Sequence, residues 1–380
     1  MELLIVLYIF ISTFFLCGYA GNEDSVSLTK SQMPFVVVSF FILLYFHCAV
    51  DLYSVEDLGA YENRYNEAAK LSFYTFNDAY RTKEYAFNYF SKFLTYISDD
   101  FRFFLVIYNI IYFYIYYSVL KKYSVNMPLS IIGMMLTVYY QSIFVIRQHL
   151  AISILLLTIP MIIRKKIIPF LLICLLSFYI HMSSIVWIPI YFLYNIRDNR
   201  MYVLFLLLTV VAIIASGYYM QDFAIFIEAD YSLYIDHSSK TSLTKNLINI
   251  SYLIVYMLTL NKDMFKEGIN KFTTTLLILN TIGYLFAPQV ELIDRLLTYY
   301  NIAIIFSIPL TWYYIKSVSL RNIFVVAIIV LQGYVSLQPL KADYFRNYDF
   351  VPLYYPYFIL CLLTTYLLYR KHLKKTITQN

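Results

Sequence analysis

The sequence predicts an all-α integral membrane protein, folded as one polytopic bundle of about 13 transmembrane helices over residues 1–380. Three observations predict this class. Hydrophobic residues make up 61% of the chain and charged residues 14%, whereas soluble domains average about 45–50% and about 25%. Apolar runs recur along the whole chain at close to the length that crosses a bilayer as a helix. Lysine and arginine gather in alternate loops, as they do beside the cytoplasmic ends of transmembrane helices.

The predicted spans are apolar runs bounded by polar or charged residues. The first starts at Met1 without a basic segment or a cleavage site of small residues, so we expect a retained span rather than a removed signal peptide. Several runs are shorter than the roughly 17 residues of a straight crossing, which allows a re-entrant or broken helix among them. In chain order the predicted spans are 1–17, 34–50, 101–119, 129–146, 149–163, 167–181, 183–196, 201–219, 247–260, 272–288, 297–315, 322–338 and 353–369.

The largest segment outside the predicted spans is 51–102. Its later half, Glu84–Ser98, repeats apolar side chains at helical spacing and adds four further aromatic residues, a pattern typical of a helix that lies in the membrane interface. The repeated positions are Phe87, Phe90, Leu94 and Ile97, and the added aromatic residues are Tyr85, Tyr89, Phe93 and Tyr96. Smaller loops are expected at 220–246 and 339–352, and a basic tail at 370–380.

The basic residues predict the orientation of the chain. One set of alternate loops, together with the C-terminal tail, holds 17 lysines and arginines, and the short loops of the other set hold 6. By the positive-inside rule the first set is cytoplasmic, so we expect the N-terminus outside and the C-terminus in the cytoplasm. The segment 51–102 and the smaller loops 220–246 and 339–352 then lie on the outer face.

Several motifs are absent from the sequence. It has no Walker A loop, no G-x-G-x-x-G, no H-E-x-x-H and no D-x-D pair. This disfavours nucleotide-driven transport and glycosyl transfer from a soluble nucleotide sugar. The four cysteines lie in apolar runs without metal-ligand spacing, so we expect no metal and no cofactor. The net charge of +6 reflects cytoplasmic loops and does not indicate a nucleic-acid partner.

Three basic side chains are expected at similar depth on the outer face. Arg147 stands between two apolar runs in the turn Arg147-Gln148-His149, His181 follows the run that ends at Ile180, and Arg295 follows Asp294. Each has an ordinary explanation, respectively a snorkelling arginine, a packed histidine and a local ion pair. Taken together they favour an anion site, because the planar guanidinium matches a pyrophosphate in bidentate fashion.

Four segments make the chain resemble the EpsG family of bacterial exopolysaccharide proteins, relatives of the Wzy-type O-antigen polymerases. They are Asp57–Tyr61, where Leu58 replaces the usual aromatic residue, Glu84–Leu94, the long stretch from Ile146 to Ile185, and Asp294–Tyr300. The third segment is the most specific, since it holds Arg-Gln-x-x-Ala, a basic turn, an apolar span and His-x-Ser. The resemblance covers roughly residues 50–315 by order and spacing.

The resemblance implies a GT-C-like helical glycosyltransferase of the bacterial cytoplasmic membrane, without a nucleotide-binding domain. Its expected substrate is an oligosaccharide linked to undecaprenyl pyrophosphate in the outer leaflet of the lipid bilayer. As a polymerase it would transfer the growing glycan to the non-reducing end of a lipid-linked repeat unit. A chain-length regulator and a flippase of the same pathway are the further expected partners.

Such a reaction needs cations for the leaving pyrophosphate and a base for the acceptor hydroxyl. We expect Arg147 and Arg295 to bind the pyrophosphate, with His181 as a hydrogen-bonding or cationic partner. Asp57 is the first candidate for the base, with Asp294 or Glu291 as the second. Further contacts with sugar or phosphate are expected from Gln148 and Tyr61.

Two other functions remain open from the sequence. A flippase or transporter of lipid-linked saccharide would need charged residues deep in the membrane, and the predicted spans are almost free of charge. An O-antigen ligase of related fold would share the donor chemistry and differ only in its acceptor.

Overall fold

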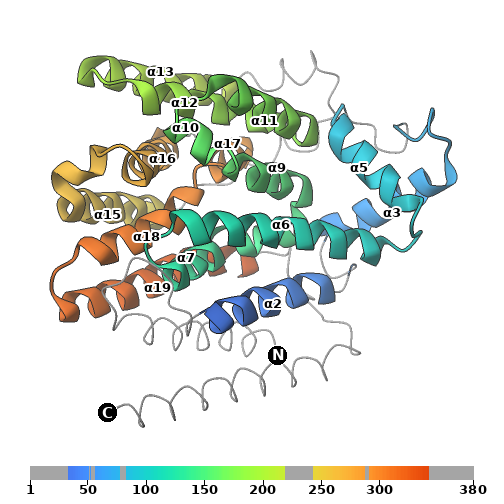
Figure 1. Ribbon diagram of the computed structural model, residues 1–380, viewed down its shortest axis with the longest axis horizontal. Helices are drawn as coiled ribbons and strands as arrows, with labels where there is room; N and C mark the ends of the chain where they lie inside the picture. The colour runs from blue at the N-terminus through green and yellow to red at the C-terminus, as the bar shows by residue number, and fades with distance from the viewer. Residues whose placement is uncertain are drawn as a thin grey trace, which may run out of the picture.

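The computed structural model describes residues 33–50, 52, 56–77, 83–218, 243–286 and 291–341, and within these ranges its elements are helices, without a strand (Figure 1). The all-helical class expected from the sequence is therefore confirmed there. The predicted spans 1–17 and 353–369, the tail 370–380 and nearly all of the loops 220–246 and 339–352 lie outside the described residues.

The helices follow the predicted spans closely in the middle of the chain. The predicted spans 34–50, 101–119 and 167–181 correspond to α2, α6 and α11. In chain order the elements are α2 Met33–Ala49, α3 Glu56–Lys70, α5 Tyr85–Thr95, α6 Phe101–Tyr123, α7 Met127–Met134, η1 Met135–Tyr139, α8 Gln141–Phe144, α9 Ile146–Leu156, α10 Ile159–Ile163, α11 Ile167–Ile180, η2 Met182–Trp187, α12 Ile188–Asn195, α13 Asn199–Tyr218, α15 Leu243–Leu260, η4 Asn261–Phe265, α16 Ile269–Phe286, α17 Glu291–Thr298, α18 Ile302–Tyr314 and α19 Val318–Lys341.

Two of the described helical stretches are long and apolar enough to cross a membrane, Phe101–Tyr123 and Ile146–Ile163. The others are shorter apolar helices, among them Ile167–Ile180 and Ile302–Tyr314. Several present large aliphatic side chains on the outside of the bundle, as α11 does with Ile168, Leu172 and Leu175. Such an outer surface matches a lipid environment rather than water.

Four of the predicted spans are interrupted, one of them, 149–163, by the turn at 157–158 between α9 and α10. The span 129–146 consists of α7, the π-helix η1 and the short α8, and 183–196 consists of the 3₁₀ helix η2 followed by α12. The span 297–315 is divided between α17 and α18 by the turn at 299–301. The turn expected at Arg147-Gln148-His149 occurs earlier, at Val145 (φ −92°, ψ 57°), so these three residues belong to α9. The interruptions expose backbone polar groups that side chains then bind, as His47 Nε2 does with the Tyr139 carbonyl oxygen at 3.1 Å.

The core of the bundle is aromatic. Tyr108, Tyr112 and Tyr116 repeat every fourth residue along α6 and are fully buried. The backbones of α7 and α18 approach closely, because Gly133 has no side chain and Ser130 Oγ donates to the Ile305 carbonyl oxygen at 2.8 Å. These contacts hold the two helices together in the core of the bundle.

The helix α5 extends outside the bundle and packs against α3 and α11 (Figure 1). On α5 itself, Phe87 and Leu94 are buried, whereas Tyr89 and Phe93 are exposed. Lys92 Nζ donates to the carbonyl oxygens of Ala68 and Leu71, both at 2.9 Å, at the C-terminal end of α3. The helix predicted within 84–98 is thus present, although Ile97 follows its last turn and is exposed.

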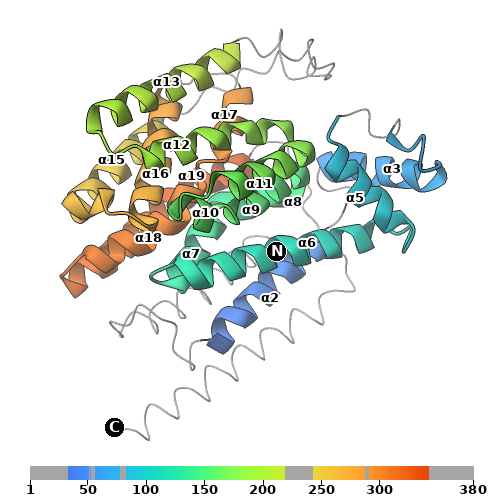
Figure 2. The same ribbon diagram turned by 45° about the horizontal axis from the view of Figure 1, so that its top comes forward.

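The turns with most of the basic residues lie at the opposite end of the bundle from α3 and α5 (Figures 1 and 2). Lys165 Nζ of the α10–α11 turn lies 3.0 Å from Glu267 Oε1 of the turn before α16. Arg197, after α12, and Lys271 also act on the Glu267 carboxylate. The basic alternate loops, which the sequence analysis assigns to the cytoplasmic side, therefore lie together at one end of the bundle.

Candidate functional site

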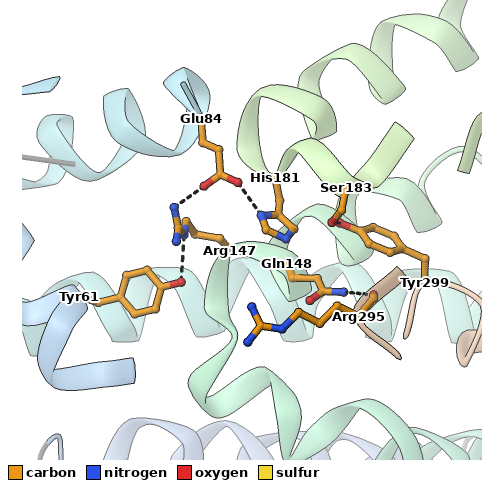
Figure 3. Close-up of polar contacts among 8 residues, drawn as sticks. All are labelled: Tyr61, Glu84, Arg147, Gln148, His181, Ser183, Arg295 and Tyr299. Atoms are coloured by element: carbon orange, nitrogen blue, oxygen red, sulfur yellow. Dashed lines mark hydrogen bonds and ion pairs between the residues drawn. The ribbon is translucent and has the colours of Figure 1, made fainter. Parts of the chain in front are cut away.

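The side chain of Arg147 is fixed by two other elements. Because the helix restarts at Ile146, Arg147 stands in the first turn of α9. Its Nη1 forms an ion pair with Glu84 Oε2, and its Nε donates to Tyr61 Oη at 3.0 Å. The guanidinium carbon lies 5.3 Å from the centroid of the Tyr61 ring. The side chain keeps 19% of its surface exposed, so the cation is held in place at the rim of the site (Figure 3).

Glu84 joins the two basic groups. It immediately precedes α5, its side chain is only 6% exposed, and its Oε1 accepts a hydrogen bond from His181 Nδ1 at 2.5 Å. The backbone N–H of Met182 donates to the same carboxyl group. Burial alone would raise the pKa of Glu84, but Arg147, His181 and the Met182 N–H together lower it to about 2. At neutral pH Glu84 is therefore a buried anion.

The imidazole of His181 is presented by the end of a helix. α11 ends at Ile180, and His181 is extended (φ −155°, ψ 116°) while its N–H still donates to the Ser177 carbonyl oxygen at 2.8 Å. The 3₁₀ helix η2 starts directly afterwards. This change of direction turns the side chain towards Glu84 and leaves it 16% exposed.

Arg295 approaches from α17. Gln148 Nε2 donates to the Arg295 carbonyl oxygen at 2.6 Å, and the hydroxyls of Ser183 and Tyr299 lie 3.0 Å apart, so α9, η2 and α17 are joined. In Figure 3 the guanidinium of Arg295 extends towards the side of the site where Arg147 and Tyr61 lie. Gln148 is buried and positions α17 through this bond.

Of the three expected carboxylates, the structure describes the side chain of Asp57. Asp57 is half-buried on α3, one turn before Tyr61. The pKa of Tyr61 is raised, chiefly by burial and further by the charge of Asp57, against the lowering effect of Arg147. Asp57 therefore acts electrostatically on the residue that holds Arg147. The side chains of Asp294 and Glu291 lie outside the described residues.

The structure thus brings Tyr61, Arg147, Gln148, His181 and Arg295 into one site from four parts of the chain. Sequence reasoning did not predict Glu84 as a site residue and used it only as the start of an interfacial helix. Its position could have indicated this role, because Glu84 lies within a segment of the family resemblance and on the same expected face as Arg147 and His181. A partly buried arginine is stabilised by such an anion.

The site combines fixed cations and an imidazole around one carboxylate. Guanidinium groups are suited to binding an anion, and a partly exposed imidazole is suited to proton transfer. Among the described residues, no group of three or more His, Cys, Asp or Glu side chains is placed to hold a metal ion.

Comparison with known proteins gives one positive result. The model of the EpsG family matches residues 33–357, most of the chain and every residue of this site. No curated protein and no solved structure matches the chain.

Proposed function

The chain belongs to the EpsG family, a family of membrane proteins of polysaccharide-polymerase type, and we propose that it polymerises a lipid-linked polysaccharide. The donor is a growing glycan on undecaprenyl pyrophosphate, and the acceptor is the non-reducing end of a lipid-linked repeat unit. The reaction takes place at the outer face of the bacterial cytoplasmic membrane. One observation carries this proposal: Arg147, Arg295 and His181, from three different elements, meet at one site.

The proposed chemistry is displacement at the anomeric carbon. The acceptor oxygen forms a bond to this carbon, while the bond from the carbon to the pyrophosphate oxygen breaks and the pyrophosphate leaves with the electron pair. Negative charge builds on the leaving group, and fixed guanidinium groups stabilise it in a site of low dielectric constant. Arg147 suits this role because Glu84 and Tyr61 hold it before substrate arrives.

The acceptor hydroxyl must lose its proton in the same reaction. The groups that serve as candidates are the Asp57 carboxylate, the His181 imidazole and Asp294 on α17. Gln148 and Tyr61 support the two arginines, Gln148 through the backbone of Arg295 and Tyr61 through Arg147 Nε.

The test uses purified protein in lipid nanodiscs with the lipid-pyrophosphate repeat unit of the source strain. We expect a ladder of products that differ by one repeat unit in mass, together with release of lipid pyrophosphate. Arg147→Ala and Arg295→Ala should each lower the rate about 10²-fold or more, as loss of a charge-stabilising group does. Arg321→Ala is the matched control, because Arg321 lies in the first turn of α19. This end of α19 is at the opposite end of the bundle from α3 and α5 (Figure 1).

The outcomes separate the alternative functions. If the folded protein makes no ladder but moves lipid-linked saccharide between leaflets, it is a flippase. If product forms only after a different acceptor is added, it is a ligase. Unchanged rates in both site variants would show that the chemistry takes place elsewhere.

A further inference from the structure

We infer that Glu84 is a positioning residue that makes His181 the general base of the transfer, by holding a hydrogen on Nδ1 and leaving Nε2 for the acceptor hydroxyl. The role of the acceptor in this inference rests on the proposed function. The state of the Glu84–His181 pair can be measured without it.

The hydrogen on Nδ1 follows from the charge of its partner. Glu84 is an anion at neutral pH, and an ionised carboxylate accepts hydrogen bonds but does not donate them. His181 Nδ1 lies 2.5 Å from Glu84 Oε1, so Nδ1 must carry the hydrogen. In the neutral ring Nε2 then has the free electron pair that a base needs.

The second ring nitrogen is available. His181 Nε2 makes no hydrogen bond with the described part of the chain, and the side chain is partly exposed. In Figure 3 the imidazole lies between the Glu84 carboxylate on one side and Gln148 and Arg295 on the other. Nε2 is therefore on the side of the ring away from Glu84, where a substrate held by the arginines would lie.

The other two described histidines show that this arrangement is specific to His181. Both ring nitrogens of His47 have partners, Asn109 Oδ1 at 3.0 Å and the Tyr139 carbonyl oxygen at 3.1 Å. His149 is buried, and neither of its ring nitrogens has a partner in the described ranges. Of the three, His181 alone pairs with a carboxylate and also reaches solvent.

In the proposed step, His181 accepts the proton of the acceptor hydroxyl. As the acceptor oxygen attacks the anomeric carbon, its proton passes to His181 Nε2 and the ring becomes a cation. Glu84 does not take a proton itself; its negative charge stabilises the imidazolium, as a carboxylate does beside a catalytic histidine. The proton is returned to water after the pyrophosphate has left.

The test measures His181 directly by ¹⁵N NMR of histidine-labelled protein in nanodiscs, with the His181 signals assigned by loss in His181→Gln. In the parent we expect a protonated Nδ1 and an unprotonated Nε2 at high pH. In Glu84→Gln the amide can either accept from Nδ1 or donate to it, so the preference for a hydrogen on Nδ1 should be lost and both tautomers should be seen. Glu67→Gln, an exposed carboxylate of α3, should leave the parent tautomer unchanged.

Activity provides the second readout. Glu84→Gln should lower kcat about 10–100-fold, the size typical of losing a group that orients a histidine, and Glu84→Asp, which keeps the carboxylate, should restore most of the loss. A purely structural role would lower activity without changing the tautomer of His181.

The result that overturns the inference is a parent His181 with its hydrogen on Nε2, or a folded Glu84→Gln in which the tautomer is the same as in the parent. If Glu84→Gln does not fold, Glu84→Asp keeps the charge and should retain the parent tautomer, and the tautomer of the parent is itself decisive. Failure of the proposed function has a different signature, a hydrogen on Nδ1 of His181 in a protein that makes no glycan ladder.

Discussion

The position of Arg147 is unfavourable for the isolated helix and is compensated by distant residues. A positive charge in the first turn of α9 opposes the helix dipole, whose N-terminal end is itself positive. The buried Glu84 carboxylate supplies the missing negative charge. The same carboxylate also pairs with His181, so one residue balances two basic groups and orders both.

Removing a single oxygen tests how Arg147 is held. In Tyr61→Phe the ring that packs beneath the guanidinium remains, but the hydroxyl that accepts from Nε at 3.0 Å is lost. We expect kcat to fall about 5–10-fold with a smaller change in KM, since one hydrogen bond to a charged group contributes about 1.5 kcal/mol or more. Tyr74→Phe, in an exposed position, is the control. An equal effect of both changes would contradict this role.

The ionisation of Glu84 links stability to pH. Its pKa is about 2 in the folded protein and about 4.3 in an unfolded chain. A lowered folded pKa gives stability that is present above the unfolded value and is lost as the pH falls towards the folded value. The difference in Tm between the parent and Glu84→Gln should therefore be largest near pH 6–7 and shrink between about pH 4.5 and pH 2. A difference independent of pH would show that Glu84 acts only by packing.

At the scale of elements, α5 owes its position to polar contacts as well as to its apolar face. Lys92 is buried and donates to two carbonyl oxygens at the end of α3, where the regular backbone hydrogen bonds of the helix stop. Because Glu84 stands at the start of α5, the attachment of α5 to α3 also determines where the site carboxylate lies. The aromatic residues Tyr89 and Phe93 of α5 are exposed, as the sequence predicts for a helix in the membrane interface.

Lys92→Met tests this attachment. The substitution keeps most of the apolar stem but leaves the two carbonyl oxygens without their charged donor, at a cost of about 1–3 kcal/mol. We expect lower thermal stability and faster hydrogen exchange in α5, followed by hydrogen-exchange mass spectrometry in nanodiscs. Lys70→Met, at an exposed position of α3, should change neither. Unaltered exchange in α5 would show that apolar packing is sufficient.

Two glycines differ in whether a side chain could be added at their positions. A Cβ added at Gly133 would lie 2.9 Å from Ile305 Cα, so α7 and α18 would have to move apart, whereas one added at Gly333 would meet Leu136 Cδ2 at 3.8 Å. Gly133→Ala should therefore destabilise the protein by about 1–3 kcal/mol. Gly333→Ala should be neutral or slightly stabilising, because alanine favours a helix. Thermal unfolding of the two variants in one detergent makes the comparison, and equal Tm values would argue against a tight α7–α18 contact.

At the scale of the whole molecule, charge and site lie at opposite ends. The basic turns that precede α11, α13 and α16 gather away from α3 and α5 (Figure 1). With the positive-inside rule this arrangement predicts that the site faces outward and the basic turns face the cytoplasm.

Cysteine labelling in intact spheroplasts tests this orientation. In a variant whose four native cysteines are replaced by serine, Ser72→Cys, between α3 and α5, should react with a membrane-impermeant maleimide added outside. Lys166→Cys, in the turn before α11, should react only after permeabilisation. Both positions are exposed, so the reverse pattern would invert the topology and place the site in the cytoplasm.

Composition and periodicity were enough to predict the all-helical class of the described residues, the helices at 101–119 and 167–181, and the helix within 84–98. These are local properties, since a segment enters lipid or lies at its surface according to its own side chains. Breaks within spans, such as that at Val145, were not predictable because tertiary contacts supply the partners of the freed backbone groups. The same holds for the role of Glu84, which is 63 residues from Arg147 and 97 from His181. A charge becomes a buried partner only when folding brings it beside its counter-ions, and sequence spacing contains no measure of that distance.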